Sequence, residues 1–321
     1  MSVSLIIPSF NNSRYITDCV RSCLVQSYRD IEVVVVDDAS TDSSWDLLLS
    51  MAKEDGRIQV HRLQENRGSN YCRNYGIDHS AGRHLLFLDS DDYLYSDRSV
   101  QALLSGFDGL IGVVHGDRCN DDGRSGVKKI VRQGSGDSRD MLIRYLKKPP
   151  ITSTLMFDRR VFATYRWDEK LLVNQEYSLL IDMLIGGVAI AHVPEVISVI
   201  RLHDSPIRKS NLNRDLYLCS RAELHQRFER LLRAMNGLTA ERADYFNLEF
   251  AKMSYLLRRF SNRPADLEVA RQLWKKVDRI KLLWSREIWG EYWLAAAACI
   301  GPAAAASLIR TLSIRKIRYE N

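Results

Sequence analysis

Residues 86–92 read Leu-Phe-Leu-Asp-Ser-Asp-Asp, an apolar run that ends abruptly in carboxylates. An apolar run of this length is typical of a buried strand. The carboxylates that follow it, Asp89, Asp91 and Asp92, repel one another unless a cation joins them. Oxygen ligands favour Mg²⁺ or Mn²⁺, which often keep part of their coordination shell for substrate phosphates. The stretch predicts a metal–diphosphate site, and the alternative for an isolated Asp-x-Asp is an acidic turn that caps a helix.

The chain before this stretch alternates between short apolar runs and segments with helical spacing of apolar residues. The expected strands are 3–8, 31–36, 58–63 and 83–88, and the expected helices between them are 13–26, 42–53 and 69–81. Strands that alternate with helices predict an α/β fold with a parallel sheet and right-handed crossovers.

Polar clusters stand at the ends of three of these strands, at 8–12, 37–40 and 89–92. Ligands of open α/β sheets bind at the carboxyl ends of the strands, all of which lie at one edge. We therefore expect the three clusters to converge on one site. This argument uses only the order of the residues.

The second half of the chain is less regular. Residues 116–136 are rich in Gly and charged residues and predict an exposed loop or hairpin. Strands are expected at 154–157 and 193–201, with a helix at 176–185. After Pro206 the pattern is helical, most strongly at 217–235, 240–260 and 265–283. We expect an α/β domain over residues 1–205 and a helical C-terminal region over 206–321.

The composition is that of a soluble globular protein, with 45% hydrophobic and 27% charged residues. Six cysteines include no Cys-x-x-Cys pair, which argues against zinc and a disulfide framework. We see no signal peptide at the N-terminus. A cytoplasmic location is expected.

Charge is unevenly distributed along the chain. Residues 206–321 hold 22 Lys and Arg against 12 Asp and Glu, whereas residues 1–205 hold 24 against 28. The basic half predicts an anionic partner. Aromatic residues are not interleaved with these charges, which argues against nucleic acid.

An uncharged, Ala-rich segment at 293–309 is too short and too weakly hydrophobic for a spanning helix. It predicts a helical pair or, with the cations after it, a helix on the inner face of the membrane; the alternative is a solvated basic terminus. The region is also a candidate oligomerisation element.

The clusters together resemble glycosyltransferase family 2, inverting enzymes with the nucleotide-diphospho-sugar-binding GT-A fold. The similarity is tight over residues 3–95 and loose over 150–205. The stretches that carry it are Ser-Leu-Ile-Ile-Pro-Ser-Phe-Asn at 4–11, Glu-Val-Val-Val-Val-Asp-Asp-Ala-Ser-Thr-Asp-Ser at 32–43, Asn-Arg-Gly at 66–68, Arg-Asn-Tyr-Gly at 73–76 and Phe-Leu-Asp-Ser-Asp-Asp at 87–92.

The resemblance implies a Rossmann-like, mostly parallel sheet and a nucleotide-sugar donor, most often a UDP-sugar. It places the base and ribose of the nucleotide near Pro8, Ser9, Phe10 and Asn11, with Asn66 and Ser90 also at the donor. Asp38, with Asp37, would accept the N–H of the base through a charge-assisted bond. Asp37 would alternatively hold its own loop by accepting backbone N–H groups. Arg73 would reach the diphosphate.

The same resemblance implies a Mn²⁺ or Mg²⁺ cofactor held by Asp91, with Asp89 toward the ribose or the metal. His203 follows a strand in an Arg-x-His segment and is a candidate metal or diphosphate ligand, or a structural histidine. A cation there would offset charge on the departing diphosphate.

Inversion at the anomeric carbon needs one general base. In the family this is an Asp in a Glu-Asp pair, and the matching residues here are Gln175 and Glu176. Glu176 is therefore the candidate base, although Glu replaces Asp and Asp182 replaces the usual Arg. Trp167 and Asp168 are candidates for the acceptor site, and Trp167 is alternatively a core residue.

The expected reaction is sugar transfer to a hydroxyl of a glycan or lipid-linked glycan in surface polysaccharide biosynthesis, such as lipopolysaccharide or capsule. One alternative is a catalytically degenerate scaffold that only binds a nucleotide sugar. A nucleotidyltransferase or dinucleotide-dependent oxidoreductase is disfavoured because the first strand is followed by no glycine-rich phosphate loop.

Overall fold

The computed structural model describes residues 2–278 except 124, 134–138, 203–213 and 262. His203, the end of the helix expected at 265–283 and the Ala-rich segment 293–309 lie outside the described residues. By internal contacts the chain divides into two compact units, Met1–Asn211 and Leu212–Asn321.

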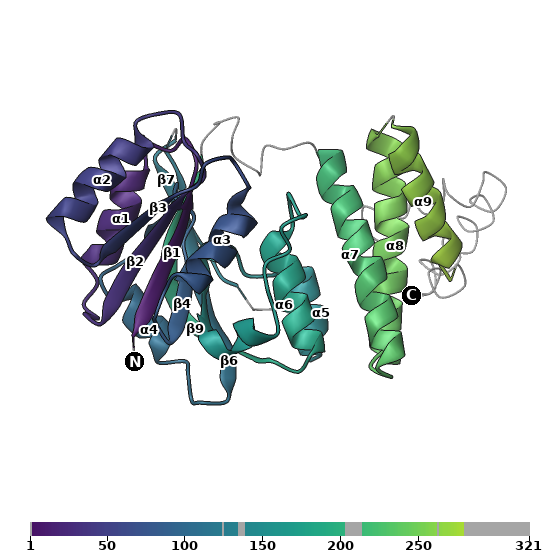
Figure 1. Cartoon of the computed structure of the whole chain (residues 1–321). Helices are drawn as coiled ribbons and strands as arrows, with labels where there is room; N and C mark the ends of the chain where they lie inside the picture. The colour runs from purple at the N-terminus through teal and green to yellow at the C-terminus, as the bar shows by residue number, and fades with distance from the viewer. Residues whose placement is uncertain (1, 124, 134–138, 203–213, 262, 279–321) are drawn as a thin grey trace. The chain divides into compact units, whose positions relative to one another are not determined.

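One sheet organises the first unit (Figure 1). Its strand order is β3-β2-β1-β4-β8-β6-β9-β5, and β7 pairs with β6. The strands are β1 Val3–Ser9, β2 Ile31–Asp37, β3 Ile58–Arg62, β4 His84–Phe87, β5 Tyr93–Leu94, β6 Ile111–Asp122, β7 Val127–Val131, β8 Leu155–Asp158 and β9 Ala189–Leu202.

The predicted α/β architecture is confirmed, since β1 to β4 are parallel and joined by helices. Beyond β4 the sheet is mixed, because β8 runs antiparallel to both β4 and β6. The parallel pair β6–β9 then follows, with irregular register near His115 and Asp117. The carboxyl ends of β1, β2 and β4 lie at one edge.

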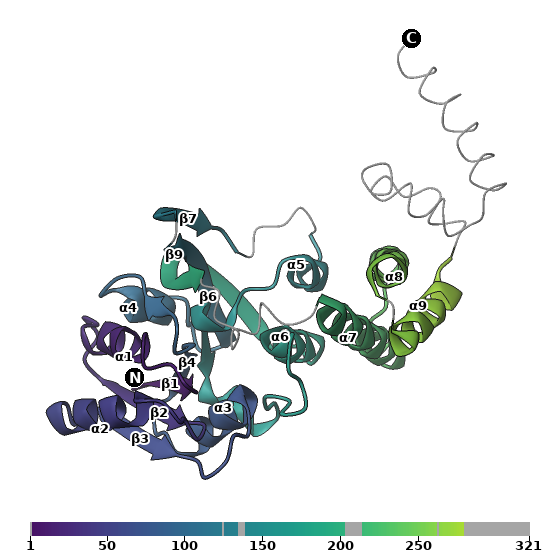
Figure 2. The same ribbon diagram turned by 90° about the horizontal axis from the view of Figure 1, so that it is seen from above.

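Helices cover both faces of this sheet (Figures 1 and 2). The helices of the first unit are α1 Ile16–Leu24, α2 Ser44–Glu54, α3 Ser69–Asp78, α4 Ser99–Leu104, α5 Met141–Lys147 and α6 Gln175–Ile185. Helices α1, α2 and α4 bury apolar side chains with one face of the sheet in a single cluster. Figure 2 shows α3 and α6 on the opposite face.

Glycines let the chain approach β1 closely. A Cβ on Gly76 of α3 would lie 2.4 Å from Ile6 Cγ2, and one on Gly82 would lie 2.4 Å from Ser4 Oγ and 2.5 Å from Ser4 N. The Gly82 N–H donates to Ser4 Oγ at 2.8 Å and to Glu32 Oε1 at 3.0 Å. The turn into β4 is therefore fixed directly against β1.

The expectation of an exposed loop or hairpin at 116–136 is half right. Val127–Val131 does form a hairpin with β6. Residues 116–119 are not exposed, however, because β6 continues through them and pairs with β9 from Asp117 and with β7 from Arg118. The hydrogen-bonding needs of a buried backbone outweigh the polar composition of this stretch.

The second unit, where described, contains α7 Arg214–Ala234, α8 Ala240–Phe260 and α9 Pro264–Lys276. The helix expected at 265–283 ends at Lys276, and Val277 and Asp278 are not helical. Asn247 of α8 explains part of this, because its side chain donates to Asp278 O at 3.0 Å and accepts from Asp278 N at 2.6 Å. Among the described residues, no helix combines the length and apolarity needed to cross a bilayer.

We predict that Gly82→Ala destabilises the first unit by about 1–3 kcal/mol, because the new methyl group would overlap backbone atoms of β1. Gly56→Ala is the matched control, since a Cβ there meets nothing within 4 Å. Urea denaturation followed by circular dichroism measures both. Equal midpoints for the two variants would show that β1 yields to the added methyl group.

Candidate active site

Side-chain hydrogen bonds join the loops that follow β1, β2 and β4. Asn11 N donates to Ser40 Oγ at 2.9 Å, and Thr41 N donates to Asn11 Oδ1 at 2.7 Å. Asn12 Nδ2 donates to Ser90 Oγ at 2.7 Å. The polar clusters at the three strand ends thus meet in space, as their order in the sequence predicts.

Backbone strain is concentrated in the same loops. Asn11, Ala39 and Asn174 have φ of 47°, 61° and 56°, although none is glycine. Left-handed geometry is unfavourable for L-residues, most clearly for alanine, and persists where surrounding contacts enforce it. Two of these residues follow β1 and β2, and the third precedes α6. Such strain is common at functional sites.

Asp37 and Asp38 hold loops in place. Asp37 is fully buried, and its Oδ2 accepts from Ser40 N at 3.0 Å, so the loop-holding alternative describes its contacts. Asp38 is 3% exposed, and its two oxygens accept from Arg67 N at 2.6 Å and Gly68 N at 2.8 Å. This differs from the expectation that Asp38 is open to a nucleotide base.

The remaining predicted donor residues differ in accessibility. Pro8 and Ser9 are buried members of β1, and Ser9 O accepts from Asp38 N at 2.8 Å. Phe10 and Asn11 are half-buried, and Asn66 is exposed with Nδ2 3.3 Å from Asp38 O. A ligand can therefore contact the loop after β1, which begins at Phe10, but not the buried end of β1 itself.

Arg73 lies inside the protein rather than on the surface of α3. It is 3% exposed, and its guanidinium donates to Asp89 Oδ1 at 2.7 Å, Asn70 Oδ1 at 2.8 Å and Gln175 Oε1 at 2.9 Å. The same group lies 4.6 Å from the centre of the Trp167 ring. Arg73 thus joins the acidic loop after β4 to the first residue of α6.

The acidic loop 89–92 is held from several directions. Ser153 Oγ donates to Asp92 Oδ2 at 2.8 Å and accepts from Asp89 N at 3.2 Å. At the end of β9, Arg201 N donates to Asp92 Oδ1 at 3.3 Å, and Arg201 Nη1 donates to the Asp91 carbonyl at 3.1 Å. Asp92, 4% exposed, therefore acts as an anchor of the loop.

The loop leaves two carboxylates for a cation. The Asp89 side chain is 39% exposed although Oδ1 pairs with Arg73, and Asp91 is half-buried. Within the part of the chain that the structure describes, His, Cys, Asp and Glu side chains do not gather in threes as a metal site. One or two carboxylates plus substrate phosphates suffice for Mg²⁺ or Mn²⁺. The donor set fits such an ion when a diphosphate completes it.

Glu176 lies in the first turn of α6 and is half-buried. Its neighbour Gln175 is held by Arg73 and by Ser69 Oγ at 3.2 Å, which fixes where α6 begins. Burial lowers the pKa of Arg118 in β6, whereas the charges of Asp92 and Glu176 raise it. The candidate base and the acidic loop therefore act on one shared cation.

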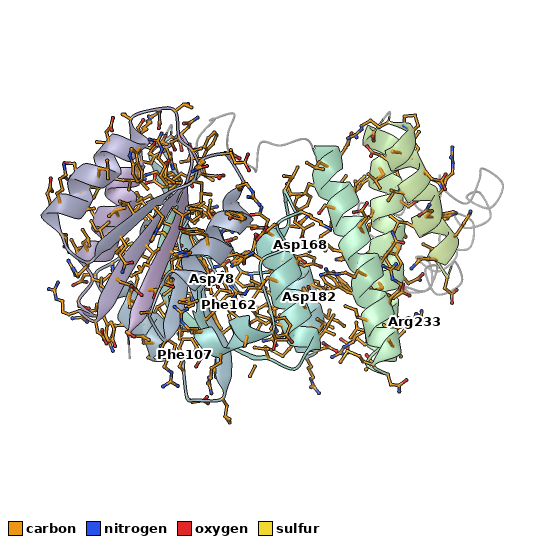
Figure 3. All side chains as sticks on the ribbon, in the orientation of Figure 1. Asp78, Phe107, Phe162, Asp168, Asp182 and Arg233 are labelled. Carbon is orange, nitrogen blue, oxygen red and sulfur yellow. The ribbon has the colours of Figure 1, made fainter. Side chains whose placement is uncertain are left out.

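Trp167 is a core residue, which was one of its two expected roles. It is 2% exposed and packs edge-to-face on Phe87, with ring centres 5.1 Å apart. An acceptor sugar cannot stack on a ring that is already covered. Asp168 lies in the exposed loop that leads into α6 (Figure 3), and its carbonyl accepts from Asn70 Nδ2 at 2.7 Å.

Arg118 and Ser153 are residues of the site that the sequence did not identify, and Gln175 was named only as the match to the family's Glu, with no role. Arg118 lies in β6, which the polar composition of 116–136 did not indicate as a buried strand. Ser153 lies in a short 3₁₀ turn at 152–154. The only available signal was for Gln175, which is adjacent to the predicted base. The side chains that position the acidic loop come mostly from segments more than 60 residues away.

Comparisons with known proteins find relatives that are named as glycosyltransferases. A protein of Bacillus subtilis named for teichuronic acid biosynthesis, the glycosyltransferase TuaG, is 45% identical over 96 residues, which cover 30% of this chain and 38% of that protein. The uncharacterized glycosyltransferase alr2836 of Nostoc is 30% identical over 168 residues, covering 50% of this chain and 52% of its own. Both matches span less than two thirds of the relative.

Solved structures show the same fold. S. aureus TarS 1–349 in complex with UDP-GlcNAc has a TM-score of 0.65 at 18% identity, over 88% of this chain and 83% of that chain. The mannosyltransferase PcManGT from Pyrobaculum calidifontis, with GDP-Man and Mn²⁺, has a TM-score of 0.52 at 19% identity, over 98% and 80%. The prediction of a GT-A fold is confirmed.

The sequence model of one family, described as glycosyl transferase family 2, matches residues 4–166. This range includes the loops after β1, β2 and β4, together with Arg73 and Ser153. Because it covers just over half of the 321 residues, the chain belongs to glycosyl transferase family 2.

Proposed function

We propose that this protein transfers a sugar, with inversion, from a nucleotide-diphosphate donor to a hydroxyl of a glycan. One observation carries the proposal: Arg73 joins Asp89 of the acidic loop to Gln175, the residue before Glu176. The acidic loop, which would bind the diphosphate, and Glu176, which could accept a proton, are thereby held at fixed positions relative to each other. Single-displacement transfer requires these two functions side by side.

The residues of the chain divide the work as follows. Glu176 would accept the proton of the attacking hydroxyl, and the Asp89–Asp91 segment would face the leaving diphosphate. Arg73 keeps Asp89 in place and contributes positive charge beneath it. A divalent cation bound by Asp89 and Asp91 would neutralise charge on the departing group. His203 remains a proposed further ligand.

A UDP-sugar is the proposed donor, with the nucleotide near Phe10, Asn11 and Asn66. The complex of TarS with UDP-GlcNAc supports this choice, as does the family resemblance. Asp38 would contact the base only after releasing one of its backbone partners. We therefore assign it first to the loop 66–68, which it holds through Arg67 and Gly68.

We predict that Asp91→Ala lowers turnover roughly 10³-fold or more, because the cation loses a carboxylate ligand. Release of UDP from a UDP-sugar with Mn²⁺ measures it, and added EDTA should reproduce the loss in the wild type. Asp46→Ala, at an exposed position in α2, is the control. Full activity of the Asp91→Ala variant would refute the metal assignment.

We predict that Glu176→Gln lowers kcat by about 10²–10⁴-fold while donor binding is retained, because the amide cannot accept the proton. Steady-state kinetics and calorimetric titration of the donor separate the two quantities. Glu195→Gln, on the exposed part of β9, serves as control. An unchanged kcat would place the base elsewhere.

A second function is favoured by one departure from the family pattern. Gln175 is neutral where a Glu is usual, and Glu176 replaces an Asp, so a nucleotide-sugar-binding scaffold without turnover is the rival. The two functions differ in a simple assay. Donor binding with no release of UDP, with any acceptor tested, would identify the scaffold.

We also propose a role in surface polysaccharide biosynthesis, on the inner face of the membrane. The name of TuaG and the basic charge of residues 206–321 support it. Deleting residues 285–321 should move the protein from the membrane fraction to the supernatant, since the deletion removes part of that charge. A variant truncated after Asp278 but carrying an added polybasic tail is the control. Unaltered partitioning of the deletion variant would contradict membrane contact.

A further inference from the structure

Arg118 carries a charge that no described side chain contacts directly, although the charges of Asp92 and Glu176 act on it from a greater distance. The residue is half-buried, and its Nε is buried and makes no hydrogen bond. Among the described residues its side chain forms neither a hydrogen bond nor an ion pair within 4 Å. A partly dehydrated cation is costly unless an anion or an array of oxygens faces it.

Arg118 is accompanied by other polar atoms that lack partners. Its register neighbour on β9 is Ser198, which is fully buried with Oγ unbonded. Asn120, two residues along β6, has a buried Oδ1 without a partner. Side chains at i and i+2 of a strand share a face, so the three groups lie together. Three buried polar atoms without partners on one face are available to form hydrogen bonds with a ligand.

These groups lie close to the acidic loop and to the candidate base. On its other side Ser198 pairs with Leu94 of β5, two residues after Asp92 of the acidic loop. The charges of Asp92 and Glu176 both act on Arg118. The orphaned groups therefore stand next to the reacting end of the site.

The hairpin extends the positive charge outward. Lys129 of β7 is opposite Asn120, on the same face, so it is a diagonal neighbour of Arg118 at about 7–8 Å between strands. Lys129 is exposed and, among the described residues, pairs with no carboxylate. Lys128, on the other face, is paired with Asp121 at 3.4 Å. Lys128 is thus paired with a described carboxylate, whereas Lys129 is not.

We propose that Arg118, Asn120, Ser198 and Lys129 form the acceptor subsite, and that the acceptor is an acidic glycan whose phosphate or carboxylate groups lie along this face. The inference rests on the proposed glycosyl transfer and specifies its acceptor class. Arg118 would hold the first anionic group next to the hydroxyl that Glu176 activates. Lys129 would bind the following one.

Binding of defined oligomers to the full chain tests the proposal without turnover. The probes are an oligogalacturonate, which carries carboxylates, a glycerol phosphate oligomer, and neutral maltohexaose. We expect at least one acidic oligomer to bind, more tightly at low salt, and maltohexaose not to bind. Whichever acidic probe binds more tightly identifies carboxylate or phosphate as the recognised group.

Variants locate the binding. Arg118→Gln should weaken the acidic oligomer roughly tenfold and Lys129→Gln about two- to fivefold, whereas Lys128→Gln should change it less than about twofold. If circular dichroism shows that Arg118→Gln does not fold, the comparison of Lys128→Gln with Lys129→Gln still tests the subsite. Absence of binding by both acidic probes, or equal losses at Lys128 and Lys129, would overturn the subsite.

Donor turnover separates this inference from the proposed function. UDP release from a UDP-sugar, measured without acceptor and with Mn²⁺, depends on the acidic loop and not on the hairpin. Release of UDP together with no acidic oligomer binding would reject the acceptor subsite alone. The opposite result is an acidic oligomer that binds, more weakly in Lys129→Gln, to a protein that releases no UDP. That result would support the subsite and reject the proposed transfer.

Discussion

The buried guanidinium of Arg73 is the contact on which the arrangement of the site depends. It connects three segments that are distant in the sequence: helix α3, the acidic loop after β4, and the start of α6. Removing the guanidinium would leave the buried Asn70 Oδ1 without its donor, a loss that typically costs about 1–3 kcal/mol. The neighbouring asparagines of α3 extend this function. Asn70 and Asn74 hold the carbonyls of Asp168 and Trp167 at 2.7 and 2.9 Å.

Helix α3 consequently does more than cover the sheet, because it also positions the segment that precedes α6. Its apolar face, with Gly76, packs on β1, and its polar face determines where the segment before α6 runs. The sequence around Arg73 matches the family pattern, and each of these residues has a physical task in the fold. The same segment brings Glu176 near the acidic loop, so stability and the proposed chemistry depend on the same hydrogen bonds.

The first four strands and the convergence of their polar ends could be predicted from the sequence, because continuous β-branched runs such as 31–36 have few other stable arrangements. Strand β6 could not. Its central residues, Gly116, Asp117 and Arg118, lack an apolar pattern, and they join the sheet because Asp117 and Arg118 pair with β9 and Arg118 also pairs with β7.

The candidate site was predictable to a similar degree. The acidic loop was identified by its composition, but the contacts of Asp38 depend on a loop 29 residues further along. Trp167 had two equally good roles until its neighbours were known. Its ring lies between Phe87 and Arg73, which no local pattern records. Long-range contacts of this kind decide which polar residues remain available to a ligand.

The β6–β7 hairpin joins the nucleotide half of the unit mainly through strand pairing with β8 and β9. Backbone ladders tolerate a change of side chain, whereas the network around Arg73 does not. Residues 120–131 can therefore change while the hydrogen bonds around Arg73 stay intact. Under the proposed assignment of the acceptor subsite, replacing the hairpin alone is the most economical way to change the acceptor.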